Sequence, residues 1–341
     1  MIIVLNNDAS AKDAADIADM LTARGKTPRI VNGLRQPVVI ANCSKNEEDK
    51  MIAEFNALKA VERMIFSSKK YQLASREFCR EDSIVSIGGH KLGGNYFQII
   101  AGPCSVENLE QMRQTAETIS SCGVKLLRGG AYKPRTSPYD FQGLGEEGLE
   151  IFSQIKAEYC VSAVTEIISE QHLQKLVKSV DCLQIGSRNG QNYQLLEAIA
   201  AAGLPVILKR AMASTVEEWL SAADYLLVNG CKDVILCERG IKTFETATRN
   251  TLDLSAVVIA KKETHLPVIV DPSHAAGRVD LLLPLSRAAI AAGANGLMLE
   301  VHPKPSVALS DGGQQIPTAA FPAFVKSLEP ILNAMNLICN K

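Results

Sequence analysis

The residues best suited to chemistry stand at the ends of short apolar runs after residue 97. Eight such runs can be traced, and each ends in a side chain that can bind a metal, bind an anion or move a proton. These side chains are Cys104, Arg128, Glu166, Arg188, Lys209, Arg239, His274 and Glu300, with His302 just beyond Glu300. Because burying so many polar groups without partners is costly, the set as a whole predicts a functional site.

Four of these side chains are cationic, although the net charge of the chain is only −1. They are Arg128, Arg188, Lys209 and Arg239. Like charges that converge on one place repel, so an anionic ligand is needed to offset them. Arginine forks suit phosphate and carboxylate groups. Residues 133–138 (KPRTSP) add a second basic, hydroxyl-bearing segment. Two anion sites predict two phosphorylated substrates or one large one.

A second group consists of one thiol, one imidazole and two carboxylates. Its members are Cys104, His274, Glu300 and Asp311. Such a mixed set suits Mn²⁺, Fe²⁺, Co²⁺ or Zn²⁺ better than Ca²⁺ or an all-oxygen Mg²⁺ site. Taken singly, Cys104 fits a buried thiol and Asp311 a turn residue. The prediction of a divalent metal ion therefore depends on a fold that brings the four together.

The apolar runs themselves predict that fold. They lie at 98–104, 124–130, 162–167, 182–188, 205–210, 233–240, 267–274 and 296–303, with helical stretches between them. This alternation is typical of a parallel sheet covered on both faces. A doubly wound open sheet is the alternative, but no G-x-G-x-x-G follows the first run. We predict an α/β protein with a (β/α)₈ TIM barrel over residues 98–341, a length close to the ~250 residues typical of that fold.

A different rhythm precedes the barrel. Strand patterns at 2–5, 27–31, 37–41 and 60–66 alternate with helices from the Ser10 cap through Arg24 and over 46–57. Asn32-Gly33 predicts a hairpin turn. Residues 1–66 thus predict a ferredoxin-like β-α-β-β-α-β domain for binding or association. We expect residues 67–97 to form a linker and a small hairpin about Gly88–Gly94.

Composition excludes several classes of protein. With 36 basic and 37 acidic residues and a single Trp219, the chain lacks the charge and the stacking platforms of a nucleic-acid binder. Nine cysteines without a C-x-x-C pattern suit a reducing compartment. The N-terminus has no basic signal region, and Pro284 and Arg287 interrupt the longest apolar stretch. We expect a cytoplasmic protein that binds neither nucleic acid nor membrane.

Long motifs then point to one family. The chain resembles the 3-deoxy-D-arabino-heptulosonate 7-phosphate synthases, in the form with a ferredoxin-like regulatory domain before the barrel. The matching segments are AGPCSVE (101–107), LLRGGAYKPRTSPYDFQGLGEEGL (126–149), QIGSRN (184–189), LKR (208–210), ILCERGI (235–241), TRNTLDLSAV (248–257), DPSHAAGR (271–278) and EVHPKPSVALSDGGQQ (300–315). The KPRTS segment separates this family from the octulosonate 8-phosphate synthases, which carry an Asn-containing variant there.

The resemblance implies an activity. The family is metal-dependent transferases that condense phosphoenolpyruvate with erythrose 4-phosphate, release phosphate and open the shikimate pathway. Metal ligands would be Cys104, His274, Glu300 and Asp311. Phosphoenolpyruvate would be held by Arg128, Lys133, Arg188, Lys209 and Arg239, and the sugar phosphate by the Pro134, Arg135 and Thr136 segment. In our hypothesis Lys133 protonates the developing alkoxide, and Glu166 or His274 activates the attacking water.

The resemblance also implies regulation and assembly. It predicts a homotetramer whose N-terminal domain binds an aromatic amino acid as inhibitor. Arg29 stands where tyrosine-sensitive relatives carry a His and a Ser, so the inhibitor stays open, and an association surface is the alternative. Other readings are an octulosonate synthase, a Schiff-base aldolase using Lys209, and a non-catalytic amino-acid sensor.

Overall fold

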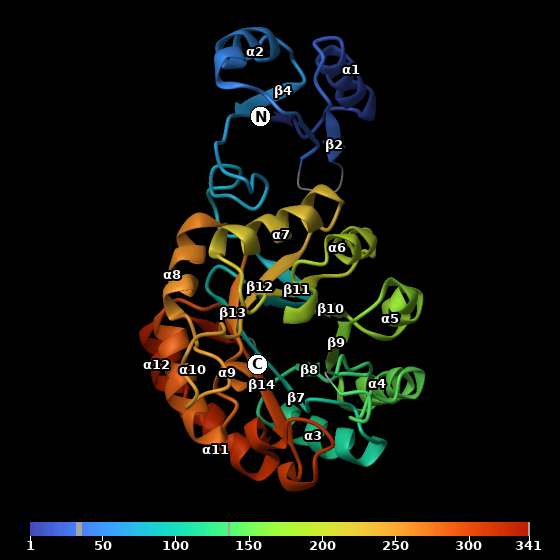
Figure 1. Ribbon diagram of the computed structural model, residues 1–341, viewed down its shortest axis with the longest axis vertical. Coiled ribbons are helices and arrows are strands. Elements are labelled where there is room, and N and C mark those ends of the chain that lie inside the picture. The colour runs from blue at the N-terminus through green and yellow to red at the C-terminus, as the bar shows by residue number, and fades with distance from the viewer. Residues whose placement is uncertain (32–35, 136, 340–341) are drawn as a thin grey trace.

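The computed structural model describes residues 1–31, 36–135 and 137–339. A small N-terminal domain stands on a larger barrel, and α7 (Val216–Val228) and α6 (Tyr193–Ala200) of the barrel lie nearest to it (Figure 1). The predicted turn at Asn32-Gly33 lies outside the described residues. No helix in the described ranges is long and apolar enough to cross a membrane.

The N-terminal domain has the predicted ferredoxin-like order. It contains β1 (Ile2–Leu5), α1 (Ala11–Thr22), β2 (Arg29–Val31), β3 (Val38–Ile40), α2 (Glu48–Phe55) and β4 (Val61–Ile65). The four strands form an antiparallel sheet in the order β2-β3-β1-β4. Ser10 caps α1 in a capping box with Asp13, so the helix begins as predicted. Both helices end two residues earlier than their patterns suggested.

The segment that follows this domain is fastened to the barrel. The Asp224 carboxylate accepts hydrogen bonds from the backbone N–H groups of Gln72, Leu73 and Ala74. Next come the hairpin strands β5 (Val85–Ile87) and β6 (His90–Leu92). The apolar side chains of this hairpin join the core inside the barrel, where they cover one of its ends. The expected boundaries at residues 66 and 97 stay predictions.

The barrel itself confirms the predicted fold. Its strands, within the described residues, are β7 (Tyr96–Gly102), β8 (Leu126–Arg128), β9 (Ser162–Ile167), β10 (Cys182–Ile185), β11 (Val206–Lys209), β12 (Val234–Glu238), β13 (Val268–Val270) and β14 (Gly296–His302). All are parallel to their neighbours, and β14 pairs with β7 to close the ring. Two short strands, β15 (Ile316–Pro317) and β16 (Ile338–Cys339), pair in parallel with β14 and β7 respectively. Closure leaves the central strands without free edges.

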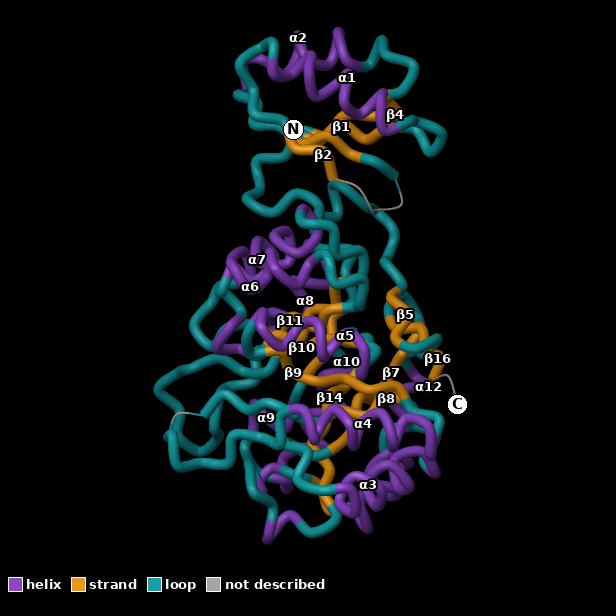
Figure 2. The backbone as a smooth tube through the Cα atoms, turned by 90° about the vertical axis from the view of Figure 1, so that its right-hand side faces the viewer, coloured by secondary structure: helices purple, strands orange, loops and turns teal. Residues whose placement is uncertain are grey.

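Helices surround the barrel on the outside (Figure 2). The longer ones are α3 (Leu109–Ser121), α4 (Glu146–Tyr159), α5 (Leu173–Ser179), α6 (Tyr193–Ala200), α7 (Val216–Val228), α8 (Leu254–Glu263), α10 (Leu282–Ala291), α11 (Phe321–Lys326) and α12 (Glu329–Ala334). The short α9 (Pro272–Ala276) directly follows β13. Residues 281–301, the longest apolar stretch, contain α10, a turn and most of β14, as expected of a non-membrane segment.

Candidate active site

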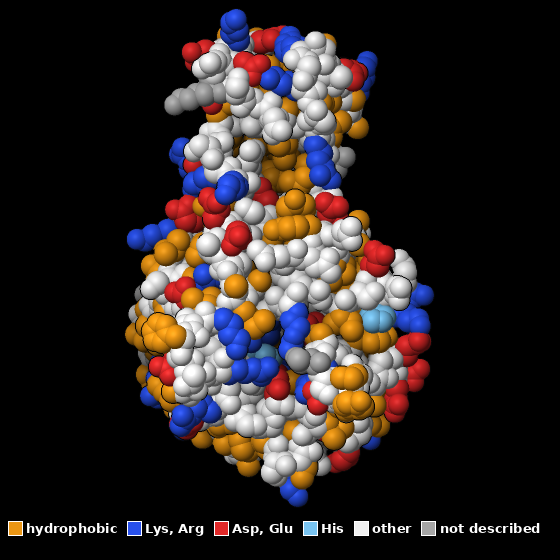
Figure 3. Space-filling view, in the orientation of Figure 1, with side chains coloured by type: hydrophobic (Ala, Val, Ile, Leu, Met, Phe, Trp, Pro, Cys, Tyr) orange, Lys and Arg blue, Asp and Glu red, His pale blue; other side chains and the backbone are white. Residues whose placement is uncertain are grey.

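A cleft of about 430 Å³ opens where the barrel strands end. Its walls carry many cations, and Figure 3 shows Lys and Arg side chains gathered around a hollow in the barrel. The cationic lining residues are Lys133, Arg135, Arg188, Lys209, Arg239, Lys242 and Arg249. Asp140, Glu166, His274 and Asp311 also line it. Because positive charge prevails, the cleft suits an anionic ligand with more than one charged group.

Most of the predicted site residues meet here. Lys133, Pro134, Arg135, Glu166, Arg188, Lys209, Arg239, His274 and Asp311 line the cleft. Cys104, Arg128 and Glu300 are buried and connect to it through contacts described below. Thr136 lies outside the described residues. His302 was placed with the strand-end group, but its Nε2 atom instead lies 3.4 Å from Glu107 Oε2.

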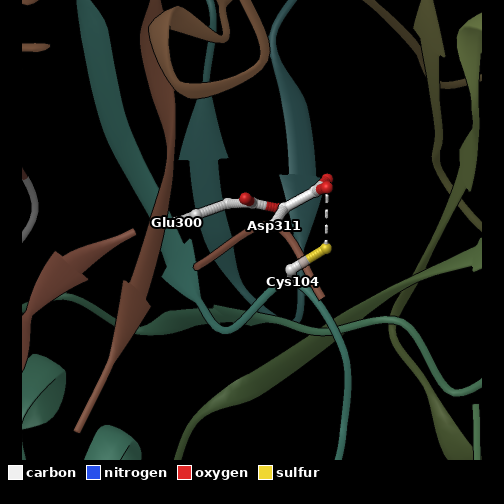
Figure 4. A group of neighbouring side chains, drawn as sticks. All are labelled: Cys104, Glu300 and Asp311. Carbon is white, nitrogen blue, oxygen red and sulfur yellow. Dashed lines mark hydrogen bonds between the residues drawn. The ribbon is translucent and has the colours of Figure 1, made fainter. Parts of the chain in front are cut away.

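Three of the four predicted metal ligands form one group (Figure 4). The ligand atoms of Cys104, Glu300 and Asp311 all lie within 4.8 Å of one another. The Cys104 thiol lies 3.6 Å from Asp311 Oδ2 and donates to it. His274 is outside this group, although its Nε2 atom lies 3.5 Å from Glu300 Oε1. A thiol, two carboxylates and an adjacent imidazole are a donor set that fits a divalent transition metal.

The strands position this group closely. Glu300 on β14 lies opposite Gly102 at the end of β7, two residues before Cys104. Gly102 has a φ of +155°, and a Cβ there would lie 2.0 Å from the Arg128 carbonyl oxygen. Only glycine allows β7 to pass so near β8. The closure of the barrel thus brings the thiol and the carboxylate together.

The charges of the group follow from its surroundings. Burial raises the pKa of the Cys104 thiol to about 12, and the Glu300 carboxylate adds to the shift. Burial also disfavours a charged Glu300, but His274 and Arg128 outweigh it and lower the pKa of Glu300. For Asp311 the Arg249 charge outweighs burial and lowers the pKa to about 2. The carboxylates are therefore ionised and the thiol protonated at neutral pH.

Buried cations occupy the floor of the cleft. Arg128 donates from Nη1 to Glu300 Oε1 at 2.7 Å and to the Pro103 carbonyl at 2.9 Å. Lys209 Nζ lies 2.6 Å from Oδ2 of the buried Asp271. Among the described residues, the Nε atoms of Arg128 and Arg239 are buried without a hydrogen-bond partner. Such unpaired donors are costly unless a ligand accepts from them.

Lys133 and Glu166 both depend on a neighbouring glycine. Lys133 Nζ donates to the Cys104 carbonyl at 3.0 Å. The Lys133 side chain packs against Gly130, where an added Cβ would lie only 2.4 Å from Lys133 Cδ. A Cβ at Gly186 would similarly lie 1.9 Å from Glu166 Oε1. Burial lowers the pKa of Lys133, but Cys104 and Glu166 outweigh it, so the net shift is upward and the amine is an ammonium ion.

His274 is held by its own helix cap. Its backbone N–H donates to Asp271 Oδ1, the N-cap of α9, at 2.9 Å. Its Nδ1 atom lies 2.7 Å from Asp271 Oδ2, without the alignment of a hydrogen bond. Burial lowers the pKa of His274, which leaves the imidazole neutral at pH 7 and able to bind a cation.

Several site residues were missed from the sequence. Asp271 directly follows β13 and satisfies the same strand-end rule that found the others. Lys242 and Arg249 lie in the long loop between β12 and α8. No strand periodicity indicates where a loop residue points, so the place of Arg249 in the cleft had no signal beyond the TRNTLD motif, and Lys242 lies outside the matching motifs.

The fold and cleft first define a (β/α)₈-barrel protein with a cationic mouth over a thiol and carboxylate group. Comparison then identifies its family: the chain belongs to the DAHP synthetase I family, whose model matches residues 79–334. The resemblance stated from the motifs is confirmed. The chain is 45% identical over 340 residues to the phospho-2-dehydro-3-deoxyheptonate aldolase of Thermotoga maritima, covering 100% of both proteins.

Two solved structures of related proteins are similar to this chain over most of its length. The crystal structure of the Thermotoga maritima phospho-2-dehydro-3-deoxyheptonate aldolase (DAHP synthase) matches with a TM-score of 0.79 over 99% of each chain, at 45% identity. A truncated form of the 3-deoxy-D-arabino-heptulosonate 7-phosphate synthase from the same organism matches with a TM-score of 0.75 at 48% identity, over 80% of this chain and 100% of that one. A 2-dehydro-3-deoxyphosphooctonate aldolase of Acidithiobacillus ferrooxidans is 28% identical over 253 residues, covering 69% of this chain and 89% of that protein.

Proposed function

We propose that this protein condenses phosphoenolpyruvate with erythrose 4-phosphate to give 3-deoxy-D-arabino-heptulosonate 7-phosphate and phosphate, the first step of the shikimate pathway. The observation that carries the proposal is the cationic cleft above the Cys104, Glu300 and Asp311 group. Two phosphorylated substrates need such a charge excess. The full-length similarity to a protein named for this reaction supports the same conclusion.

Each substrate has its own cations in this proposal. Phosphoenolpyruvate is held by Arg128, Lys133, Arg188, Lys209 and Arg239, and the unpaired Nε donors of Arg128 and Arg239 support that role. The phosphate of erythrose 4-phosphate is held by Arg135 and Thr136, next to Pro134. Arg135 lies 3.3 Å from Asp140, a long and partly exposed ion pair that an incoming phosphate can replace.

A divalent ion, Mn²⁺, Fe²⁺, Co²⁺ or Zn²⁺, completes the site. Its ligands in this proposal are Cys104, His274, Glu300 and Asp311. When bound, the ion supplies Lewis acidity toward the aldehyde of erythrose 4-phosphate. The protein contributes the geometry: the closed barrel fixes Cys104 beside Glu300, and Asp271 holds the helix of His274.

Proton transfer is assigned to residues that reach the cleft without serving as ligands. Lys133 is an ammonium ion beside Cys104, so it can donate to the alkoxide that forms at the aldehyde oxygen. C3 of phosphoenolpyruvate attacks the aldehyde carbon, and water adds at C2. We assign activation of this water to Glu166 in preference to His274, because a metal-bound imidazole nitrogen cannot accept a proton. The C2–O bond to phosphate then breaks, and the cationic residues stabilise the leaving phosphate.

Lys209 bears on the Schiff-base alternative. A nucleophilic amine would have to be free of carboxylates, whereas Lys209 Nζ lies 2.6 Å from Asp271 Oδ2. This contact favours an anion-binding role for Lys209.

Regulation, assembly and location complete the proposal. The N-terminal domain binds an aromatic amino acid that inhibits the barrel, and four copies of the chain associate. The protein works in the cytoplasm, and nine cysteines without a C-x-x-C pattern suit a reducing compartment. Arg29 donates to Asn229 at the end of α7, which gives the N-terminal domain a direct contact with the barrel.

Phosphate release measures the sugar specificity. Purified protein is supplied with phosphoenolpyruvate and either erythrose 4-phosphate or arabinose 5-phosphate, and phosphate is followed over time. We expect release with erythrose 4-phosphate to be far faster. A preference for arabinose 5-phosphate would instead establish the octulosonate synthase reaction, which the 28% identical relatives represent.

A further inference from the structure

Arg249 lies outside the sets assigned above, yet it contacts one of the proposed metal ligands directly and a second through Gln314. Its Nη1 atom donates to Asp311 Oδ2 at 3.0 Å and to Gln314 Oε1 at 2.9 Å. Gln314 in turn donates from Nε2 to Glu300 Oε2 at 2.7 Å. The amide is thereby oriented, because its oxygen faces a cation and its NH₂ group faces a carboxylate. One guanidinium thus reaches Asp311 directly and Glu300 through a single buried side chain.

The same loop also holds the third ligand, His274. The backbone N–H groups of Arg249 and Asn250 donate to the Ala276 and Ala275 carbonyls of α9. Asn250 Nδ2 donates to the His274 carbonyl at 3.0 Å. These contacts tie the segment that carries Arg249 to the helix that carries His274.

The packing around Arg249 is close. A Cβ at Gly277 would lie 2.6 Å from the Arg249 Cβ, so a side chain at 277 would displace the arginine. Gln314 is 2% exposed, whereas the Arg249 side chain is 37% exposed at the wall of the cleft. The buried amide therefore has a fixed place, and the arginine approaches it from the solvent side.

We propose that Arg249 and Gln314 are positioning residues that hold the carboxylates of Asp311 and Glu300 in place for a divalent cation. The inference rests on the proposed metal site. Outer-shell hydrogen bonds orient ligands in this way, and their loss typically weakens metal binding by roughly 10–100-fold. The positive charge of Arg249 opposes the cation, but its hydrogen bonds to Asp311 and Gln314 hold both carboxylates in place, and in our inference this effect outweighs the repulsion.

Metal binding without substrate tests this role. The full-length protein is freed of metal with a chelator and titrated with Mn²⁺ by electron paramagnetic resonance, and with Co²⁺ by absorbance. R249Q and Q314L should each bind Mn²⁺ about 10–100-fold more weakly and alter the Co²⁺ ligand-field bands. R249K, which keeps the charge but loses the fork, should weaken binding by less.

The matched control is R278Q. Arg278 lies near the same wall, but its guanidinium pairs with Asp280 and its side chain is 52% exposed, so this variant should bind Mn²⁺ as the native protein does. Circular dichroism and thermal unfolding show whether each variant is folded. If Q314L does not fold, R249Q carries the test, because it is altered at a partly exposed side chain.

Unchanged or tighter Mn²⁺ binding by folded R249Q overturns the inference. A substrate KM that rises while Mn²⁺ affinity holds would make Arg249 an anion binder instead. If the native protein binds neither ion, the proposed metal site fails together with the inference.

Discussion

At the scale of single residues, the proposed metal site depends on Cys104. This thiol is fully buried, donates to Asp311 and lies in the group with Glu300. A buried thiol alone is an ordinary core residue. Its position beside two ionised carboxylates is what indicates a ligand, because a thiolate there needs a cation to balance the charge.

Replacing Cys104 with alanine should remove bound metal and lower phosphate release by at least about 100-fold. Metal content of the purified variant and the rate of phosphate release are the two readouts. C122A, altered at a half-buried cysteine beside the end of α3, serves as the control and should match the native protein. A C104A variant with full metal content and full activity would rule out this ligand.

The pKa of Cys104 also predicts a pH dependence. At neutral pH the thiol is protonated, since its pKa is raised to about 12, while the Glu300 and Asp311 carboxylates are already ionised. Burial lowers the pKa of His274, so the imidazole is already neutral and releases no proton when it binds a metal ion. Binding one metal ion should therefore release about one proton, and affinity should rise about tenfold per pH unit from pH 7 to 8.

Calorimetry in buffers of different ionisation enthalpy counts that proton. A metal affinity that is independent of pH over this range would contradict thiolate ligation.

Replacing Lys133 should affect the rate of the chemical step, measured as kcat, more than substrate binding. K133M removes the proposed proton donor and should lower kcat by about 10²–10⁴-fold. K156M, at a lysine paired with Asp181 on the outside of the barrel, is the matched control and should leave kcat unchanged. The measurement is steady-state phosphate release at saturating substrates. A variant that raises only KM would restrict Lys133 to holding phosphoenolpyruvate.

At the scale of elements, the sequence predicted the position of a site residue best where that residue lies at the end of a strand. Arg128, Lys209 and Glu300 could be placed because the apolar runs locate strand ends, and parallel strands of a barrel end at one face. Arg249 and Lys242 could not, because the path of the loop after β12 depends on backbone contacts with α9 that no local pattern encodes. His302 ends β14, as its place in the last run suggested, but the pattern could not show that its side chain turns toward Glu107.

The segment between the two domains also makes contacts that no local sequence pattern could predict. Its polar, Gly-rich composition suggested a linker, but residues 72–74 are bound by Asp224 on α7. Asp224→Ala leaves three backbone N–H groups without their acceptor and should lower the free energy of unfolding by about 1–3 kcal/mol. Chemical denaturation measures this loss. D140A, at an exposed aspartate, is the control, and equal stability of the two variants would show that the segment is not anchored there.

At the scale of the whole molecule, our proposal assigns catalysis to the barrel and regulation to the N-terminal domain. The β1 residues Ile2 and Val4 share an apolar cluster with Tyr71 and Leu73, so the N-terminal sheet packs on a segment that is itself fastened to the barrel. Deletion of residues 1–66 should leave phosphate release within a few-fold of the native rate and abolish inhibition by an aromatic amino acid. The solved structure of a truncated relative covers 80% of this chain.

Inhibition assays with phenylalanine, tyrosine and tryptophan on both forms measure this division. A shortened protein that is still inhibited would place the effector site on the barrel.

The most direct measurement for the whole account is phosphate release from phosphoenolpyruvate and erythrose 4-phosphate, before chelation, after chelation and after Mn²⁺ is restored. We predict release that requires erythrose 4-phosphate, disappears with the chelator and returns with Mn²⁺. Release that persists in protein shown to contain no metal would contradict the role assigned to Cys104, His274, Glu300 and Asp311. No release with either sugar under any condition would contradict the proposed reaction itself.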